Sequence, residues 1–579
     1  MHSSFFTTAA SPYVSSFTAR LIALALLLAG ACAQQADLVL RNGKIVTVDE
    51  RRGTVQALAA RGGRILAVGS DENVRRFIGG ETRVIDLRGR LAVPGFIEGH
   101  AHFTGVGEMT QILDLTKVES WDQVVRMVGD AAKNKQPGEW IVGRGWHQEK
   151  WQQAPEGGVK GFPSHESVSA ATPSNPVALT HASGHAAFFN AKAMEIAGIT
   201  KDTKNPAGGE IIKKANGEPT GVFSETAAGL VSRHQRGREL RRTAAQRRDA
   251  IRRQTLLAAE ECLRKGVTSF QDAGSNFATI DVFREMAERG ELPVRLWVMV
   301  RTSIRDLERR IQNYRMVGVG DHFLTVRALK RSIDGALGSR GAWLLEPYSD
   351  APESSGLETA TVESVTRMAE LGLQHGFQVC VHAIGDRANR EVFDIYEKVW
   401  GETDSHALRW RIEHAQHLHP DDIPRFGKLG VIASMQGVHC TSDAPYVIPR
   451  LGEQRAREGA YVWQKLRQTG AVVTNGSDAP VEDVDPIASF YASVSRRLKD
   501  GSTFYPEQAM TRMEALRSYT IDCAFAAFEE DIKGSLVPGK LADVVVLSKD
   551  ILTVPETEIL EARVDMTIVG GKVAFDATR

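Results

Sequence analysis

Residues 91–102 read LAVPGFIEGHAH, and the interpretation of the whole chain starts from them. An apolar run enters a Pro-Gly turn, continues as a short strand and ends on His100 and His102. Side chains two positions apart in a strand point to the same face, so these two imidazoles can share one metal ion. A His-x-His pair alone is weak support, because polar residues at a strand end have an ordinary structural explanation. The rest of the chain has to supply the argument.

Length and composition indicate an ordinary globular protein. The 579-residue chain is long enough for more than one domain, and its 42% hydrophobic and 25% charged residues are typical values. Lys+Arg and Asp+Glu both number 71, so no net field attracts nucleic acid or an acidic membrane surface. We therefore expect no nucleic-acid partner.

Residues 1–33 have the form of a secretory signal peptide. Arg20 precedes an apolar run at 21–29, and Ala31 and Ala33 make an Ala-x-Ala cleavage site. The run is too short for a comfortable membrane anchor, so we expect export to the periplasm or beyond without a stable membrane span. Cys32 allows a lipoprotein as the alternative, although Ala29 stands where such signals usually carry leucine.

The cysteines of the mature chain do not suggest a disulfide framework. They are widely spaced and form no Cys-x-x-Cys pair, which argues against both disulfide staples and a zinc-thiolate site. We expect buried free thiols at Cys262, Cys380, Cys440 and Cys523.

Both ends of the chain carry short strand patterns. Residues 36–48 read as two strands around an Asn42-Gly43 turn, and residues 55–69 as a second hairpin. Similar patterns recur at 542–547 and 566–574. Because neither end is long enough to bury a core alone, we expect residues 34–93 and 536–579 to form one composite β-sandwich domain.

Residues 94–535 alternate between strand and helix. Apolar residues recur at helical spacing in 245–265 and 362–374, and both runs stop at a glycine. Eight such units predict an α/β fold, a (β/α)₈ TIM-type barrel. Residues 138–240 are rich in Gly, Pro and short irregular runs, so we expect an insertion over the barrel mouth. The candidate strands are residues 96–102, 267–272, 294–300, 324–330, 378–382, 409–414, 431–435 and 471–475.

Polar side chains collect where these strands end, which is where barrels of this type carry their functional residues. Any one of them has an ordinary explanation as a capping, solvated or turn residue. Six in this order are hard to obtain by accident. They are His100, His102, Lys330, His382, His414 and Asp478.

The chain resembles the metal-dependent amidohydrolase superfamily, and more closely its YtcJ-like branch, amidohydrolase family 3. The resemblance covers essentially the whole mature chain. Two residues depart from the family pattern: Glu98 stands where aspartate is usual, and His147 where an acidic or amide residue is commoner. The matching motifs are PGFIEGHAH at 94–102, Lys330 with Asp334-Gly335, VHAIGD at 381–386, EHA at 413–415, GSDAP at 476–480 and GSLVPGKLAD at 534–543.

The resemblance implies a centre with one or two divalent metal ions. His100, His102 and Asp478 would hold one metal, and His382 and His414 a second. Lys330 would bridge them as a carbamate formed with CO₂. The alternative is an ordinary salt-bridged lysine beside a one-metal site. Zinc is the expected metal, although the same ligands suit manganese and iron.

The implied activity is hydrolysis of a C–N bond in a small amide, formamide or N-acyl compound. Metal-bound hydroxide would attack the carbonyl carbon, and Asp478 would pass the proton to the leaving nitrogen. His185 matches a family motif and would contact the substrate or oxyanion, with a structural role as the alternative. A deaminase or cyclic-imide hydrolase on the same site, or a non-catalytic exported binding protein, are the other readings. The sequence leaves room for a homo-oligomer.

Further residues are candidates for lining the pocket. For each of them, packing or hydrogen bonding behind the site is the simpler role. They are His181 in the insertion, with Trp146, Trp151, Glu225, Arg340, Asp386 and His439.

Overall fold

The computed structural model describes residues 1–2, 35–240 and 242–577. The expected signal peptide, with Cys32, lies almost entirely in residues 3–34 and so falls outside the described residues. Within the described ranges, no helix combines the length and the apolar character that crossing a bilayer requires.

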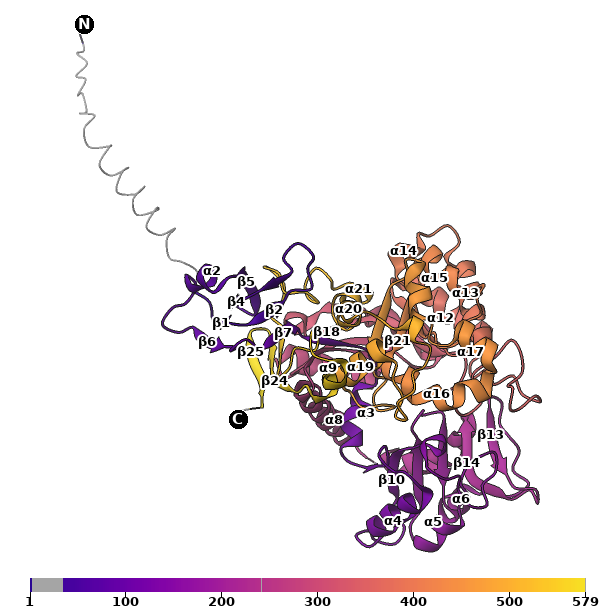
Figure 1. Cartoon of the computed structure of the whole chain (residues 1–579). Helices are drawn as coiled ribbons and strands as arrows, with labels where there is room; N and C mark the ends of the chain where they lie inside the picture. The colour runs from indigo at the N-terminus through magenta and orange to yellow at the C-terminus, as the bar shows by residue number, and fades with distance from the viewer. Residues whose placement is uncertain (3–34, 241, 578–579) are drawn as a thin grey trace.

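Eight parallel strands form a nearly closed barrel at the centre of the molecule (Figure 1). Neighbours in the barrel are neighbours in the sequence, and each predicted strand overlaps one observed strand. The predicted alternation of strands and helices is confirmed. The strands are β8 (Phe96–Ala101), β15 (Val267–Ser275), β16 (Arg295–Val300), β18 (Leu324–Ser332), β19 (Gln378–Ala383), β20 (Arg411–His414), β21 (Ile432–Gln436) and β22 (Val473–Gly476).

The two ends of the barrel sheet meet where β8 passes the loop after β22. The backbone N–H of Asp478 donates to the carbonyl of His100 at 2.8 Å. The buried carboxylate of Glu98 accepts hydrogen bonds from the backbone N–H of Ser477 at 2.7 Å and from its hydroxyl at 2.9 Å. The departure from the family pattern at Glu98 therefore concerns the barrel seam.

Helices cover the outside of the barrel, each burying one face. In α12 (Val362–His375), Thr361 caps the first turn and Gly376 ends the helix in the left-handed conformation. Val365, Met368 and Ala369 are its buried stripe. The other outer helices include α8 (Ala244–Arg264), α9 (Phe277–Glu288), α10 (Ile304–Arg310), α13 (Asp386–Trp400), α15 (Ile423–Leu429), α16 (Gly437–Leu451), α18 (Trp463–Gln468), α19 (Pro486–Ser495) and α21 (Ile521–Ala526).

Strands from both ends of the chain lie in one six-stranded sheet, and Figure 1 shows the yellow C-terminal strands beside the indigo N-terminal ones. A four-stranded sheet shares its apolar core, which includes Leu40, Leu58, Val546 and Ile568. The strand order in the six-stranded sheet is β25 (Lys572–Asp576), β24 (Val564–Val569), β23 (Val544–Leu547), β7 (Leu91–Pro94), β2 (Lys44–Val46) and β3 (Thr54–Val55). The strand order in the four-stranded sheet is β5 (Arg64–Gly69), β4 (Ala57–Arg61), β1 (Leu38–Arg41) and β6 (Arg83–Asp86).

The hairpin interpretation of Asn42-Gly43 is wrong. Strands β1 and β2 flank this turn as predicted, but β1 pairs with β4 and β6, whereas β2 pairs with β3 and β7. A Cβ on Gly43 would lie 2.4 Å from Leu87, so the glycine lets the chain pass close to that side chain. The turn therefore carries the chain from one sheet to the other.

The segment between β8 and α8 is more regular than the sequence indicates. It contains a six-stranded mixed sheet that begins before residue 138, and it forms the lower lobe of Figure 1 with α4 (Trp121–Ala132), α5 (Glu166–Ala171) and α6 (Ala191–Ala197). The sheet runs β13 (Gly209–Lys213), β14 (Pro219–Glu225), β12 (Ala186–Phe189), β11 (Val177–His181), β10 (Ile141–Trp146), β9 (Leu113–Asp114).

The four cysteines of the described chain, Cys262, Cys380, Cys440 and Cys523, are buried and unpaired, as predicted. Burial raises the pKa of each thiol, so none is a ready thiolate nucleophile.

A buried ion pair joins the barrel to the composite sheet. Arg295 in β16 contacts Asp543 through two hydrogen bonds of 2.8 and 3.1 Å, and their side chains are 2% and 6% exposed. Asp543 also accepts the backbone N–H of Gly570 at 2.7 Å. One carboxylate thus connects three segments that are far apart in the sequence.

We expect Asp543→Asn to lower the free energy of unfolding by about 3–5 kcal/mol, because it leaves a guanidinium buried without its counter-charge. Thermal and urea unfolding measure the loss. Asp130→Asn is the control, since Asp130 pairs with Lys133 on an exposed helix end, where solvent screens the pair and its contribution to stability is small. Equal unfolding curves for the two variants would contradict the prediction.

Candidate metal centre and substrate cavity

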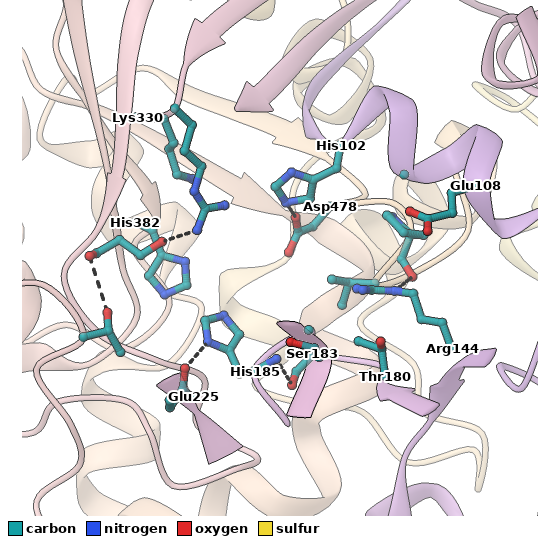
Figure 2. A pocket seen from close by; sticks show the side chains of 18 of the residues that line it. His102, Glu108, Arg144, Thr180, Ser183, His185, Glu225, Lys330, His382 and Asp478 are labelled. Carbon is teal, nitrogen blue, oxygen red and sulfur yellow. Dashed lines mark hydrogen bonds and ion pairs between the residues drawn. The ribbon is translucent and has the colours of Figure 1, made fainter. Parts of the chain in front are cut away.

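A cavity of about 950 Å³ opens at the carboxyl ends of the barrel strands (Figure 2). Its floor is the barrel, and part of its wall comes from the β9–β14 lobe. All six residues predicted as metal ligands line this cavity: His100, His102, Lys330, His382, His414 and Asp478. Which of them bind metal stays a prediction.

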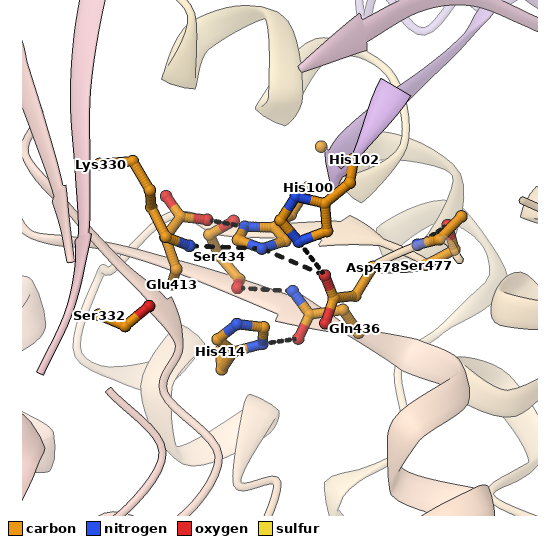
Figure 3. A network of polar contacts seen from close by, with 12 residues as sticks. His100, His102, Lys330, Ser332, Glu413, His414, Ser434, Gln436, Ser477 and Asp478 are labelled. Atoms are coloured by element: carbon orange, nitrogen blue, oxygen red, sulfur yellow. Dashed lines mark hydrogen bonds and ion pairs between the residues drawn. The ribbon is translucent and has the colours of Figure 1, made fainter. Parts of the chain in front are cut away.

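The tightest group within this set is His100, His414 and Asp478, whose potential ligand atoms lie within 4.8 Å of one another. Asp478 Oδ1 also lies 3.3 Å from His102 Nε2 and 3.5 Å from His100 Nε2 (Figure 3). This group takes members from both of the metal sites that the resemblance implies. The two sets are therefore one continuous cluster.

His382 and Lys330 extend the cluster on its other side. The imidazole centroids of His382 and His414 are 4.5 Å apart. Lys330 Nζ lies 3.5 Å from His100 Nε2. Among the described residues, no carboxylate oxygen lies within 4.0 Å of that ammonium.

The donor set fits a divalent metal. Asp478 Oδ1 and His382 Nε2 are buried and make no hydrogen bond within the described structure. His414 donates from Nδ1 to Gln436 Oε1 at 2.8 Å, which leaves its Nε2 lone pair for a ligand. Buried polar atoms without partners are costly, and a metal ion satisfies a carboxylate and several imidazoles at once.

Burial tunes the charge of these ligands. Burial, and then the charge of Lys330, lower the pKa of His100 to about 4. Burial also lowers the pKa of His382 and His414 well below the usual value. All three imidazoles are thus neutral at pH 7, the form that binds metal. Burial lowers the pKa of Lys330 to about 8.

Glu413 orients His100 from beneath the site. It was not identified as a site residue from the sequence. Its carboxylate accepts a hydrogen bond from His100 Nδ1 and one from Arg411 at 3.0 Å. Burial alone would raise the pKa of Glu413, but the charges of Arg411 and then His100 hold it well below the usual value. Its place immediately before His414 in the motif is the only signal the sequence offered.

A second, much smaller cavity of about 40 Å³ adjoins the cluster. It shares His185, His382, His414 and Asp478 with the large cavity, so these side chains separate a large space from a small one. His185 hydrogen-bonds through Nδ1 to Glu225 at 2.8 Å (Figure 2). Burial opposes protonation of His185, but the charge of Glu225 raises its pKa.

The secondary candidates divide by position. Glu225 lines the large cavity, and His439 lines the small one, where its Nδ1 accepts a hydrogen bond from Gln416 at 3.1 Å. Neither cavity is lined by the remaining five. His181 is tied to Gln148 and Ser183, Trp146 donates to the Leu179 carbonyl, Trp151 packs against Trp121, Arg340 pairs with Asp350, and Asp386 accepts the N–H of Leu345.

Three further cavity residues were not predicted. Arg301 and Arg331 line the large cavity, and Tyr446 lines the small one, stacked on His147 at 5.5 Å. Arg301 directly follows β16 and Arg331 directly follows Lys330. Their positions at strand ends are the same signal that identified the histidines, and it applied to them equally well.

Comparison with known proteins identifies the family of this chain. The model of the Amidohydrolase family (Amidohydro_3) matches residues 83–575. The chain belongs to this family. The matched range contains both the barrel and the C-terminal strands.

Three relatives are similar over nearly their whole length. Protein LONG AFTER FAR-RED 3 of Arabidopsis thaliana is 35% identical, covering 93% of this chain and 92% of the relative. Putative amidohydrolase YtcJ of Bacillus subtilis is 28% identical, covering 92% and 98%. N-substituted formamide deformylase of Arthrobacter pascens is 27% identical, covering 94% and 99%. This chain therefore belongs to the YtcJ-like branch of the family.

Among solved structures, an uncharacterized metal-dependent hydrolase from Pyrococcus horikoshii OT3 superposes with a TM-score of 0.71. It is 26% identical, and the match covers 90% of this chain and 99% of that one. The family and these relatives support metal-dependent hydrolysis of C–N bonds.

Proposed function

We propose that this family member hydrolyses the C–N bond of a small N-substituted formamide or closely related N-acyl compound, with a divalent metal at the His100–Asp478 cluster. The observation that carries the proposal is the cluster itself. Six potential ligand side chains line one cavity, and two of them bury polar atoms without a hydrogen bond.

The residues that would hold metal are His100, His102, His382, His414 and Asp478, and zinc suits this mixture of imidazole and carboxylate. When bound, the metal supplies a Lewis acid and an activated water. The protein's own contribution is to hold neutral imidazoles in place and to exclude bulk water from the buried side of the cluster.

Asp478 is the group that we propose moves the proton. We assign to its carboxylate the proton lost when water adds to the carbonyl carbon, and its delivery to the nitrogen as the C–N bond breaks. The products are a carboxylate and an amine. His185, held by Glu225 with its other ring nitrogen free for the cavity, would donate a hydrogen bond to the carbonyl oxygen.

The sizes of the two cavities favour a substrate with a small acyl group. The 40 Å³ space beside the cluster has room for a few atoms only, whereas the 950 Å³ cavity admits a much larger substituent. A carbonyl carbon at the cluster would thus direct a formyl or similar group inward and the amine substituent outward. The formamide deformylase relative acts, by its name, on substrates of this shape.

Lys330 fits the bridging carbamate better than a salt bridge. No carboxylate of the described structure pairs with it, and burial lowers its pKa to about 8, which favours the neutral amine that reacts with CO₂. A carbamate would replace an unpaired buried cation by an anionic ligand. Carboxylation of Lys330 is accordingly part of the proposal.

Two further assignments rest on the sequence. We propose that residues 1–33 direct export, by cleavage after Ala33 or, alternatively, by lipidation of Cys32, and N-terminal sequencing of the mature protein tests this. We also propose that residues 34–93 and 536–579 form one composite sandwich domain, which the shared core of the two sheets supports.

Turnover with and without metal tests the proposed function. We expect the purified protein to release formate from a panel of N-alkyl and N-benzyl formamides, to lose this activity on chelation, and to regain it with zinc, manganese or iron. Ammonia release from heterocyclic amines would indicate a deaminase instead. A fully metal-loaded protein that turns over no amide, formamide or cyclic imide would favour a binding protein and overturn the proposal.

A further inference from the structure

The large cavity holds an unbalanced pair of positive charges. Arg301 and Arg331 line its wall, and neither makes an ion pair with a carboxylate in the described part of the chain. Three acidic side chains line the same cavity, and each is engaged elsewhere: Glu225 binds His185, Asp478 belongs to the metal cluster, and the charge of Glu108 acts on Arg144. The charges of Asp478 and Asp272 reach Arg301, but both carboxylates are held by other groups, so neither guanidinium has an ion-pair partner among the described residues.

The two arginines come from neighbouring barrel strands. In the parallel pairing of β16 with β18, Val300 lies opposite Leu329, so Arg301 and Arg331 follow at the same rim. Arg301 donates from Nη2 to Ser332 Oγ at 3.3 Å. Both residues thus approach the cavity from the side of Lys330.

The backbone makes room for Arg301. Gly274 has φ +143°, and a Cβ built on it would lie 2.7 Å from both Cβ and Cδ of Arg301. Any other residue would displace the arginine stem. Arg301 is nevertheless an exposed residue, and because it lines the cavity, its side chain is accessible to a ligand.

A third arginine of the cavity shows the contrast. Arg144 donates to the carbonyl of Pro480 at 3.1 Å and to that of Ala182 at 3.1 Å, so its guanidinium joins segments of the protein. Arg331 Nε, in comparison, is buried and has no hydrogen-bond partner among the described residues. Donors left open in a cavity wall are what an anionic ligand satisfies.

We propose that the substrate carries a carboxylate on its amine side, bound by Arg301 and Arg331 while its acyl group lies at the metal cluster. The proposal rests on the proposed function and names its substrate class: N-formyl or small N-acyl amino acids. A carboxylate matches the planar forks of the guanidinium groups and supplies one negative charge per substrate molecule. The cavity has room for the spacer between this carboxylate and the acyl group.

The proposal is tested by comparing the hydrolysis of three achiral acids, which differ in spacer length, with that of their carboxamides. The acids are N-formylglycine, N-formyl-β-alanine and N-formyl-4-aminobutyrate. We expect kcat/KM for the acid to exceed that for its carboxamide at least about tenfold at one spacer length. Arg301→Met and Arg331→Met should each lower kcat/KM for the acid by about tenfold to 100-fold, mainly through KM, and move the acid-to-carboxamide ratio towards one.

Arg301→Lys should retain part of the preference because it keeps the charge, whereas Arg305→Met, on the exposed face of α10, should leave the ratio unchanged. Equal rates for acids and carboxamides in a protein that hydrolyses both would overturn the inference but leave the proposed function intact. If neither series is hydrolysed, calorimetry of N-formyl-β-alanine binding decides: saturable binding that Arg301→Met abolishes supports the inference, and absence of binding overturns it.

Discussion

Asp478→Asn is expected to lower kcat on N-substituted formamides by about 10²–10⁴-fold while the protein stays folded. The amide has the shape of the carboxylate but cannot accept a proton from water and release it to nitrogen. Asp478 has φ 56°, in the left-handed region that asparagine tolerates better than most residues. Its backbone N–H still donates to His100, so the barrel seam is preserved.

Formate release measures this prediction, and metal analysis together with thermal unfolding accompanies it. Asp500→Asn serves as the matched control, because Asp500 lies in an exposed turn and bonds only to Ser502 among the residues described. A metal-loaded Asp478→Asn protein with wild-type kcat would remove Asp478 from the proton path. Loss of the metal itself would assign Asp478 the role of a ligand first.

Lys330→Ala is expected to reduce the metal content from about two ions per chain to one and to lower kcat/KM by about 100-fold or more. The bridging anion disappears, and the imidazoles that remain must share the charge of two cations. Because the truncated side chain leaves space beside His100, formate or acetate at high concentration should enter it and restore part of the activity. Elemental analysis and turnover with added carboxylate measure both effects.

The rescue has its own control. Added acetate should not restore Asp478→Asn, since there the missing function is proton transfer and no space has been opened. If Lys330→Ala keeps its full metal content and its activity, Lys330 is not a ligand. That result would favour the alternative of an ordinary lysine beside a one-metal site. Rescue without a change in metal content would show that the carboxylate replaces a charge and not a bridge.

Much of the barrel was predictable because its signals are local. Apolar spacing, glycine stops and β-rich runs each occupy a few consecutive residues, and the observed α8, α12 and all eight barrel strands overlap the predicted ranges. Strand ends were less accurate: β15 continues past Asp272 to Ser275, and β18 continues past Lys330 to Ser332. These extensions depend on pairing with neighbouring strands, which a single strand's sequence does not reveal.

The errors occurred where pairing is not local. The Asn42-Gly43 turn has the composition of a hairpin, yet its two strands found partners in different sheets because apolar faces of both had to be buried. The sheet of the β9–β14 lobe escaped notice because Gly and Pro interrupt its strands, and its order depends on non-local pairings such as Ile141 with Val177 and Ala186 with Ser224.

By itself, the sequence determined the family, the alternation of strand and helix, and the six polar residues at strand ends, since all of these are patterns of residue type and spacing. Only the tertiary structure decided that His100, His414 and Asp478 form one tight group and that Glu413 supports His100. It also decided that Arg301 and Arg331 share a cavity wall without an ion-pair partner among the described residues. The physical reason is that proximity, burial and the absence of a partner are properties of pairs of residues distant in the chain, and they exist only once the barrel has closed.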